Sequence, residues 1–119
     1  MNNFYNPYKK KFSKYRNVKT TVDNIKFDSK HEAERYKELQ MLVKAGEITN
    51  LRLQVPFELI PSLKINGETF RVTKYIADFV YNDKNGNEVV EDAKGMKTDV
   101  YKLKRKLMAY VHNIIIREV

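Results

Sequence analysis

The stretch YIADFVYNDKNGNEVVEDAKG, residues 75–95, decides the fold. It holds two apolar runs rich in Val, Ile, Tyr and Phe, which favour β-strands, joined by a Gly/Asn-rich segment typical of a hairpin turn. Asp78 interrupts the first run, and Asp92 and Lys94 end the second. Buried acids are costly unless a cation joins them, so their position in apolar runs needs a chemical reason.

Side chains alternate between the two faces of a strand, which places Asp92 and Lys94 on one face and Asp78 on the same face as Val80. A turn of this length makes the two strands neighbours. We therefore expect Asp78 and Asp92 to lie side by side, with Lys94 one step beyond.

A helix is predicted over roughly residues 30–45. Ser29 is a good N-cap, Glu32 completes a capping box, and Gly46 favours a C-terminal stop. Glu32 also falls on the apolar stripe of this helix, so it is expected to face the core. If the helix packs on the face of the two aspartates, three carboxylates and a lysine converge.

The other segments extend this pattern on both sides. VKTTVDNIKF predicts a short hairpin with Asp23-Asn24 as its turn. The two prolines of LQVPFELIPS favour an edge strand or an irregular one. ING, residues 65–67, predicts a turn before TFRVTKYIADFVY, which reads as one long strand. These strands and EVVEDAKG predict an antiparallel meander of about three strands.

Two elements are predicted after the meander. MKTDVYKLKRKLMAYVH predicts a second helix, and NIIIREV predicts a short, buried closing strand. The apolar stripe expected on that helix consists of Val100, Leu103, Leu107 and Val111.

The chain of 119 residues carries a formal net charge of +8, which favours nucleic acid as a partner. Residues 1–19 form a basic, aromatic-rich arm preceding a domain at 20–119. The arm either binds nucleic acid or is a flexible terminus, and the KLKRK run either grips phosphates or is a solvated helix face. The basic residues predicted to bind nucleic acid are Lys9, Lys10, Lys11, Lys14, Arg16, Lys102 and Arg105.

The chain has no cysteine, no apolar run long enough to cross a bilayer and no secretory signal at its start, which together favour the cytoplasm. Cysteine-based zinc sites are excluded, whereas oxygen ligands from acids suit Mg²⁺ or Mn²⁺. Lys94 beside such a metal would activate a water or stabilise charge on a phosphodiester. The alternative is a solvated Asp92–Lys94 ion pair with no chemical role.

FDSKHEAERYKEL, LQVPFELIP, YIADFVY and VVEDAKGMKT, in this order, resemble the PD-(D/E)XK nuclease superfamily, and more narrowly a family of small phage and prophage proteins. The resemblance covers nearly all of Val18 to Val119. Asp78 stands for the first acid of the motif, Asp92-Ala93-Lys94 for the (D/E)XK triplet, and Glu32 for the acid on the first core helix.

This resemblance implies an α/β, restriction-endonuclease-like fold with a mixed central sheet of four to five strands flanked by helices. It also implies a Mg²⁺-dependent (or Mn²⁺-dependent) endonuclease that acts on DNA in recombination, replication or processing inside a bacterial host. The metal ligands would be Glu32, Asp78, Asp92 and the Ala93 carbonyl, and Lys94 would assist the attacking water.

Three further residues and a homodimer complete the hypothesis. Gln54 matches a glutamine near the active site of some relatives, or is simply polar on an edge strand. Lys97 is a candidate to contact the scissile strand. Glu91 offers a competing frame but should point to the opposite face, as an exposed acid or one behind the ligands. A homodimer would supply two sites for two strands.

Two alternatives to an enzyme stay open. The chain could be a non-catalytic nucleic-acid-binding protein on a nuclease-like scaffold, or a phage inhibitor of a host protein. Salt-sensitive DNA binding would separate the first from the second, and metal-dependent cleavage would separate both from a nuclease.

Overall fold

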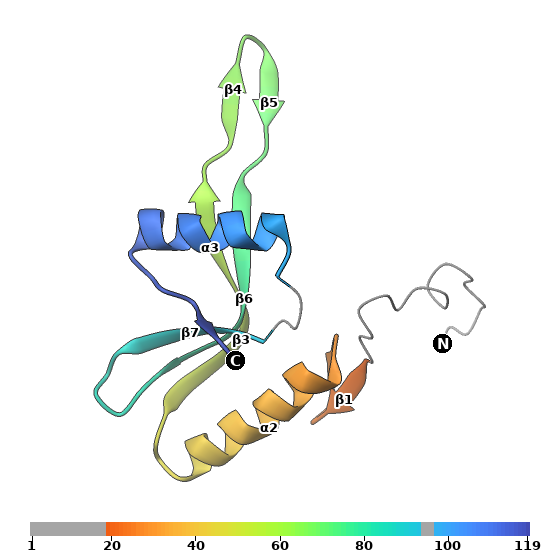
Figure 1. Ribbon diagram of the computed structural model, residues 1–119, viewed down its shortest axis with the longest axis vertical. Coiled ribbons are helices and arrows are strands. Elements are labelled where there is room, and N and C mark those ends of the chain that lie inside the picture. The colour runs from red at the N-terminus through yellow and green to blue at the C-terminus, as the bar shows by residue number, and fades with distance from the viewer. Residues whose placement is uncertain (1–18, 94–96) are drawn as a thin grey trace, which may run out of the picture.

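The computed structural model describes residues 19–93 and 97–119 (Figure 1). Predictions that fall on residues 1–18 and 94–96 lie outside the described residues. They concern the basic residues of the predicted arm, and the lysine predicted to be catalytic, namely Lys9, Lys10, Lys11, Lys14, Arg16 and Lys94.

A mixed four-stranded sheet, in the order β3-β6-β7-β8, forms the centre of the protein. Strands β3 (Thr49–Ile60), β6 (Thr73–Asn82) and β7 (Glu88–Asp92) form an antiparallel meander, and β8 (Arg117–Glu118) runs parallel to β7. The predicted α/β fold, with a mixed central sheet flanked by helices, is confirmed. The edge position predicted for the proline-containing strand is also confirmed, since β3 ends the sheet.

Helices α2 (Lys30–Lys44) and α3 (Asp99–His112) pack on opposite faces of this sheet. Consecutive strand residues point to opposite sides, so Phe79 packs with α2 whereas Val80 packs with α3. Figure 1 shows α3 crossing β3 and β6. The core therefore consists of two layers, one under each helix. No helix in the described part of the chain is long and apolar enough to cross a membrane.

The predicted N-terminal hairpin and first helix are confirmed. Strands β1 (Thr20–Val22) and β2 (Ile25–Phe27) pair across Asp23-Asn24, whose φ angles of 54° and 63° suit a tight hairpin turn. The Ser29 side chain accepts a hydrogen bond from the Glu32 backbone N–H at 3.1 Å and so caps α2.

The prediction of one long strand from Thr69 onward is wrong, although the turn at residues 65–67 is confirmed. Asn66 and Gly67 have φ angles of 51° and 81°, and they close a separate hairpin of β4 (Leu63–Ile65) and β5 (Glu68–Phe70). Because this tight turn pairs β5 with β4, pairing with β3 begins only at β6. In Figure 1 the hairpin extends beyond α3, away from the central sheet.

Of the apolar stripe predicted on α3, Leu107 packs against the core, whereas the other three residues are exposed. Val100 is 64% exposed and Leu103 is 55% exposed, whereas Tyr101 and Met108 face the sheet. The helix carries two apolar stripes, and the one that is buried also gives the Tyr101 hydroxyl a partner in Glu118 at 2.7 Å.

The closing strand is shorter and less buried than predicted. Only Arg117 and Glu118 pair with β7, and both are exposed. Burial comes instead from Ile116, which is 2% exposed, while Ile115 is 73% exposed.

Candidate active site

Asp78 and Asp92 lie on neighbouring strands. The register of β6 and β7 pairs Phe79 with Glu91, and continuing it by one residue sets Asp78 opposite Asp92. Asp78 Oδ2 accepts a hydrogen bond from the Ala93 backbone N–H at 2.8 Å. Asp78 is 5% exposed and Asp92 is 2% exposed, so two carboxylates are buried at the same end of the sheet.

Glu32 joins this site through Gln54. The Gln54 Nε2 donates to Glu32 Oε2 at 3.2 Å and to Asp78 Oδ1 at 3.4 Å. Glu32 itself is 8% exposed, which confirms its predicted inward orientation on the helix. The glutamine therefore links two of the three predicted acids.

Asp78 lies where β6 changes the helix that it packs against. Tyr75 and Ala77 pack with α3, whereas Phe79 and Tyr81 pack with α2. Glu32 lies in the first turn of α2, and the edge-strand residue Gln54 links it to Asp78.

Gln54 has an unusual backbone. Its φ is 53° in the middle of β3, and the other described non-glycine residues with positive φ are all Asn or Asp. Asn and Asp enter this left-handed region readily, but for other residues with a Cβ it costs about 1–2 kcal/mol. Strained backbone of this kind clusters at functional sites. The sequence match at Gln54 therefore has independent structural support.

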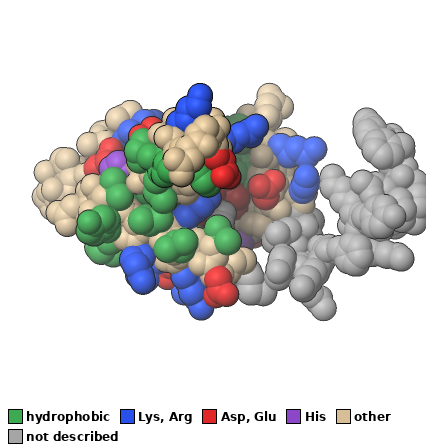
Figure 2. All heavy atoms as spheres, turned by 90° about the horizontal axis from the view of Figure 1, so that it is seen from above, with side chains coloured by type: hydrophobic (Ala, Val, Ile, Leu, Met, Phe, Trp, Pro, Cys, Tyr) green, Lys and Arg blue, Asp and Glu red, His purple; other side chains and the backbone are tan. Residues whose placement is uncertain are grey.

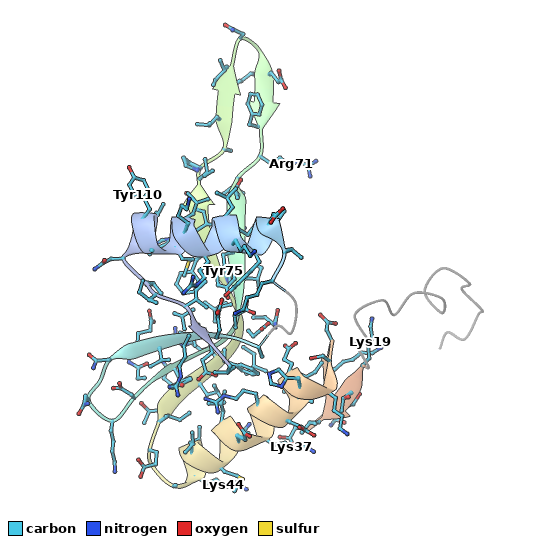
Figure 3. The ribbon with its side chains drawn as sticks, in the orientation of Figure 1. Lys19, Lys37, Lys44, Arg71, Tyr75 and Tyr110 are labelled. Carbon is cyan, nitrogen blue, oxygen red and sulfur yellow. The ribbon has the colours of Figure 1, made fainter. Side chains whose placement is uncertain are left out.

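Tyr75 holds Asp92 from the side of α3. Its hydroxyl donates to Asp92 Oδ2 at 2.7 Å, and the ring is 3% exposed (Figure 3). Burial raises the pKa of Tyr75, and the hydrogen bond to Asp92 raises it further, so the hydroxyl stays a donor at neutral pH. Sequence analysis missed this residue. In the sequence, Tyr75 is a tyrosine three positions before Asp78, and it looks like any other residue of a β-strand.

Glu118 forms ion pairs with two basic residues, Lys97 and Arg105. Lys97 Nζ lies 2.9 Å from Glu118 Oε1, Arg105 Nε lies 3.5 Å from Oε2, and the Tyr101 hydroxyl donates to Oε2 at 2.7 Å. The hydrogen bonds from Tyr101 and Lys97 lower the pKa of Glu118. Lys97 and Arg105, predicted to contact nucleic acid, thus share one carboxylate, while Lys102 is exposed on α3.

Glu91 was predicted to be either exposed or placed behind the ligands, and because it is fully buried, the exposed alternative is wrong. Arg35 Nε and Nη2 donate to its two oxygens at 2.9 and 2.7 Å, and the Tyr81 hydroxyl donates to it as well. The Glu91 hydrogen bond raises the pKa of Arg35, and burial, followed by the bond to Glu91, raises the pKa of Tyr81 to about 12. Because Glu91 faces α2, the prediction that it points away from Asp92 is confirmed. Its role is to join α2 to β7.

The three acids fit a hard divalent cation by chemistry. They offer only oxygen ligands, and they are buried, where an uncompensated negative charge is costly. Among residues 19–93 and 97–119, no group of three or more His, Cys, Asp or Glu side chains lies close enough to hold a metal ion. Gln54 lies between Glu32 and Asp78, and Tyr75 binds Asp92.

The chain belongs to a family described as "Protein of unknown function (DUF1064)", whose model matches residues 12–117. Neither the curated proteins nor the solved structures contain a match to it.

Proposed function

We propose that the protein is a metal-dependent endonuclease that hydrolyses phosphodiester bonds in DNA, in phage recombination, replication or DNA processing. The observation that carries this proposal is that three buried acids from α2, β6 and β7 are connected: Gln54 donates to both Glu32 and Asp78, and Asp78 stands opposite Asp92 on the neighbouring strand. Burying three carboxylates costs desolvation free energy and adds nothing to the stability of the fold. A metal ion that hydrolyses a phosphodiester bond would explain why they are there.

The residues Glu32, Asp78, Asp92 and the Ala93 carbonyl would hold Mg²⁺ or Mn²⁺. When bound, such an ion makes water a better nucleophile and stabilises charge on the phosphate. In this protein the Tyr75 hydroxyl donates to Asp92 Oδ2 and so fixes the orientation of that carboxylate. The amide of Gln54 orients the other two acids in the same way.

Lys94 would assist the attacking water, as the resemblance to PD-(D/E)XK nucleases suggests. The net charge of +8 supports a polyanionic substrate. Lys102, exposed on α3, and the cations of residues 1–18 would contact phosphates. Lys97 and Arg105 would first exchange their contact with Glu118 for the substrate.

The test is a nicking assay on supercoiled plasmid, linear duplex and a branched junction with Mg²⁺, Mn²⁺ or EDTA. The variants are Asp78→Ala, Lys94→Ala and Glu32→Gln, and Glu34→Gln is the matched control because Glu34 is exposed on the same helix. We expect wild type and Glu34→Gln to cleave with Mg²⁺ and not with EDTA, and the other three to lose at least about 100-fold in rate.

A second readout separates the site from its activity. Isothermal titration should show Mg²⁺ binding to wild type and Glu34→Gln, and weaker binding to Glu32→Gln and Asp78→Ala. An absence of both cleavage and Mg²⁺ binding would refute the proposal. Salt-sensitive DNA binding would then favour a non-catalytic DNA-binding protein. A lack of DNA binding would favour an inhibitor of a host protein.

A further inference from the structure

The outer stripe of α3 leaves apolar side chains in water. This stripe consists of Val100, Leu103, Tyr110 and Val111, which are 64%, 55%, 85% and 45% exposed. It includes three of the four residues that the helical period predicts as a buried stripe. In Figure 3 the Tyr110 side chain points away from the sheet. A helix with this pattern is normally covered on that side.

The β4–β5 hairpin presents a second apolar face. Leu63 pairs with Phe70, and Ile65 pairs with Glu68, so these side chains share one side of the hairpin. The apolar members, Leu63, Ile65 and Phe70, are 42%, 55% and 44% exposed. A two-stranded hairpin standing alone in water is marginally stable, and one that extends from the body needs a surface to pack against.

The two surfaces together hold seven apolar side chains that are 42–85% exposed. Single exposed apolar side chains are ordinary, whereas apolar side chains gathered on one element mark a surface that another protein covers. Figure 2, which looks down on the hairpin and α3, shows hydrophobic side chains gathered on one side, with Lys and Arg between and around them.

We propose that two copies of this chain form a two-fold dimer in which the hairpin of each copy packs on the outer stripe of α3 in its partner. A two-fold axis brings hairpin to helix twice, so one contact covers both exposed surfaces of both copies. Each chain carries both parts of this contact, namely the projecting β4–β5 hairpin and the exposed face of α3.

Charge complementarity also favours a second copy. Glu68 lies on the apolar side of the hairpin, whereas Lys64, which pairs with Thr69, lies on the other side. On α3, Lys106 is three residues after Leu103 and four before Tyr110, so it borders the outer stripe. A hairpin seated on the stripe therefore brings Glu68 toward Lys106 and keeps Lys64 in water. A DNA partner would repel Glu68.

This inference does not depend on the proposed function, because it concerns neither the acids nor a metal. Its test is sedimentation equilibrium of the full chain, without DNA or metal. The interface variants are Ile65→Glu in the hairpin and Leu103→Glu on α3. Met41→Glu is the matched control, because Met41 is 69% exposed on α2, outside both surfaces. Circular dichroism and thermal melts check that each variant folds.

We expect wild type and Met41→Glu to have the mass of two chains, and Ile65→Glu and Leu103→Glu to have the mass of one. Glu68→Lys and Lys106→Glu should each weaken association by about tenfold, and the double variant should recover most of it. A monomeric wild type at about 100 µM, well above an ordinary dimer dissociation constant, would overturn the proposal. So would a dimer that survives both interface variants while they remain folded.

Discussion

Gln54 allows backbone strain to be measured apart from side-chain chemistry. Gln54→Ala and Gln54→Gly both remove the amide that donates to Glu32 and Asp78, and they differ only in the Cβ at φ 53°. Any difference in stability between these two variants therefore reports the backbone. The matched pair is Lys74→Ala and Lys74→Gly, at an exposed β6 residue outside the positive-φ set.

The magnitude follows from two opposing effects. A Cβ in the left-handed region costs about 1–2 kcal/mol, whereas glycine in ordinary strand backbone loses about 0.5–1 kcal/mol relative to alanine. At Gln54 the first effect is larger, so the glycine variant should be more stable than the alanine variant by roughly 0.5–1 kcal/mol. At Lys74 only the second effect acts, and the order should reverse.

Urea unfolding at 25 °C, followed by circular dichroism, measures both pairs. Under the proposed nuclease function, both Gln54 variants should also cleave DNA more slowly than wild type, because neither retains the amide that donates to Glu32 and Asp78. If alanine is the more stable residue at both positions, Gln54 does not hold a strained backbone and the reasoning from its φ angle is wrong.

Three further variants test other contacts. Tyr75→Phe removes the donor to buried Asp92 and should destabilise the fold by about 1.5–3 kcal/mol in urea unfolding. Arg35→Met leaves Glu91 buried without its cation and should cost about 3–5 kcal/mol in the same measurement. Glu118→Gln tests pH dependence: because folding lowers the pKa of Glu118, its contribution is present at pH 7 and is lost as the pH falls through its folded-state pKa. Wild type should therefore melt above Glu118→Gln at pH 7, and the difference should vanish at low pH.

Controls for these variants are available on the same elements. Glu38→Ala removes only the exposed partner of Arg35 and should cost less than about 1 kcal/mol. Equal effects of Arg35→Met and Glu38→Ala would contradict the buried ion pair. Tyr110→Phe removes a hydroxyl from an exposed tyrosine, and a loss as large as that of Tyr75→Phe would show that the Asp92 contact is not responsible. A melting difference for Glu118→Gln that grows toward acid would contradict the direction of its pKa shift.

The parts of the fold that local chemistry determines could be predicted from the sequence. Ser29 caps α2, and Asp23-Asn24 and Asn66-Gly67 turn hairpins, because each depends only on a few adjacent residues. The opposite positions of Asp78 and Asp92 followed from strand alternation and the length of one turn. These signals need no knowledge of the rest of the molecule.

The remaining features depend on contacts between residues that are far apart in the sequence. Helix α3 has two apolar stripes, and the sequence period cannot say which one meets the sheet. Glu91 looks like a surface acid until Arg35, 56 residues away in sequence, is brought to it. Tyr75 and Glu118 have no distinctive local pattern, so their contacts beside the site emerge only in three dimensions.

The Arg35–Glu91 ion pair lies directly behind the candidate site. Arg35 follows Glu32 by one helical turn, and Glu91 immediately precedes Asp92, so the pair clamps the two segments that carry these acids. The pair therefore fixes the spacing between α2 and β7, the two elements that carry Glu32 and Asp92. Substitutions around these acids can then leave the alignment of the helix with the strand unchanged.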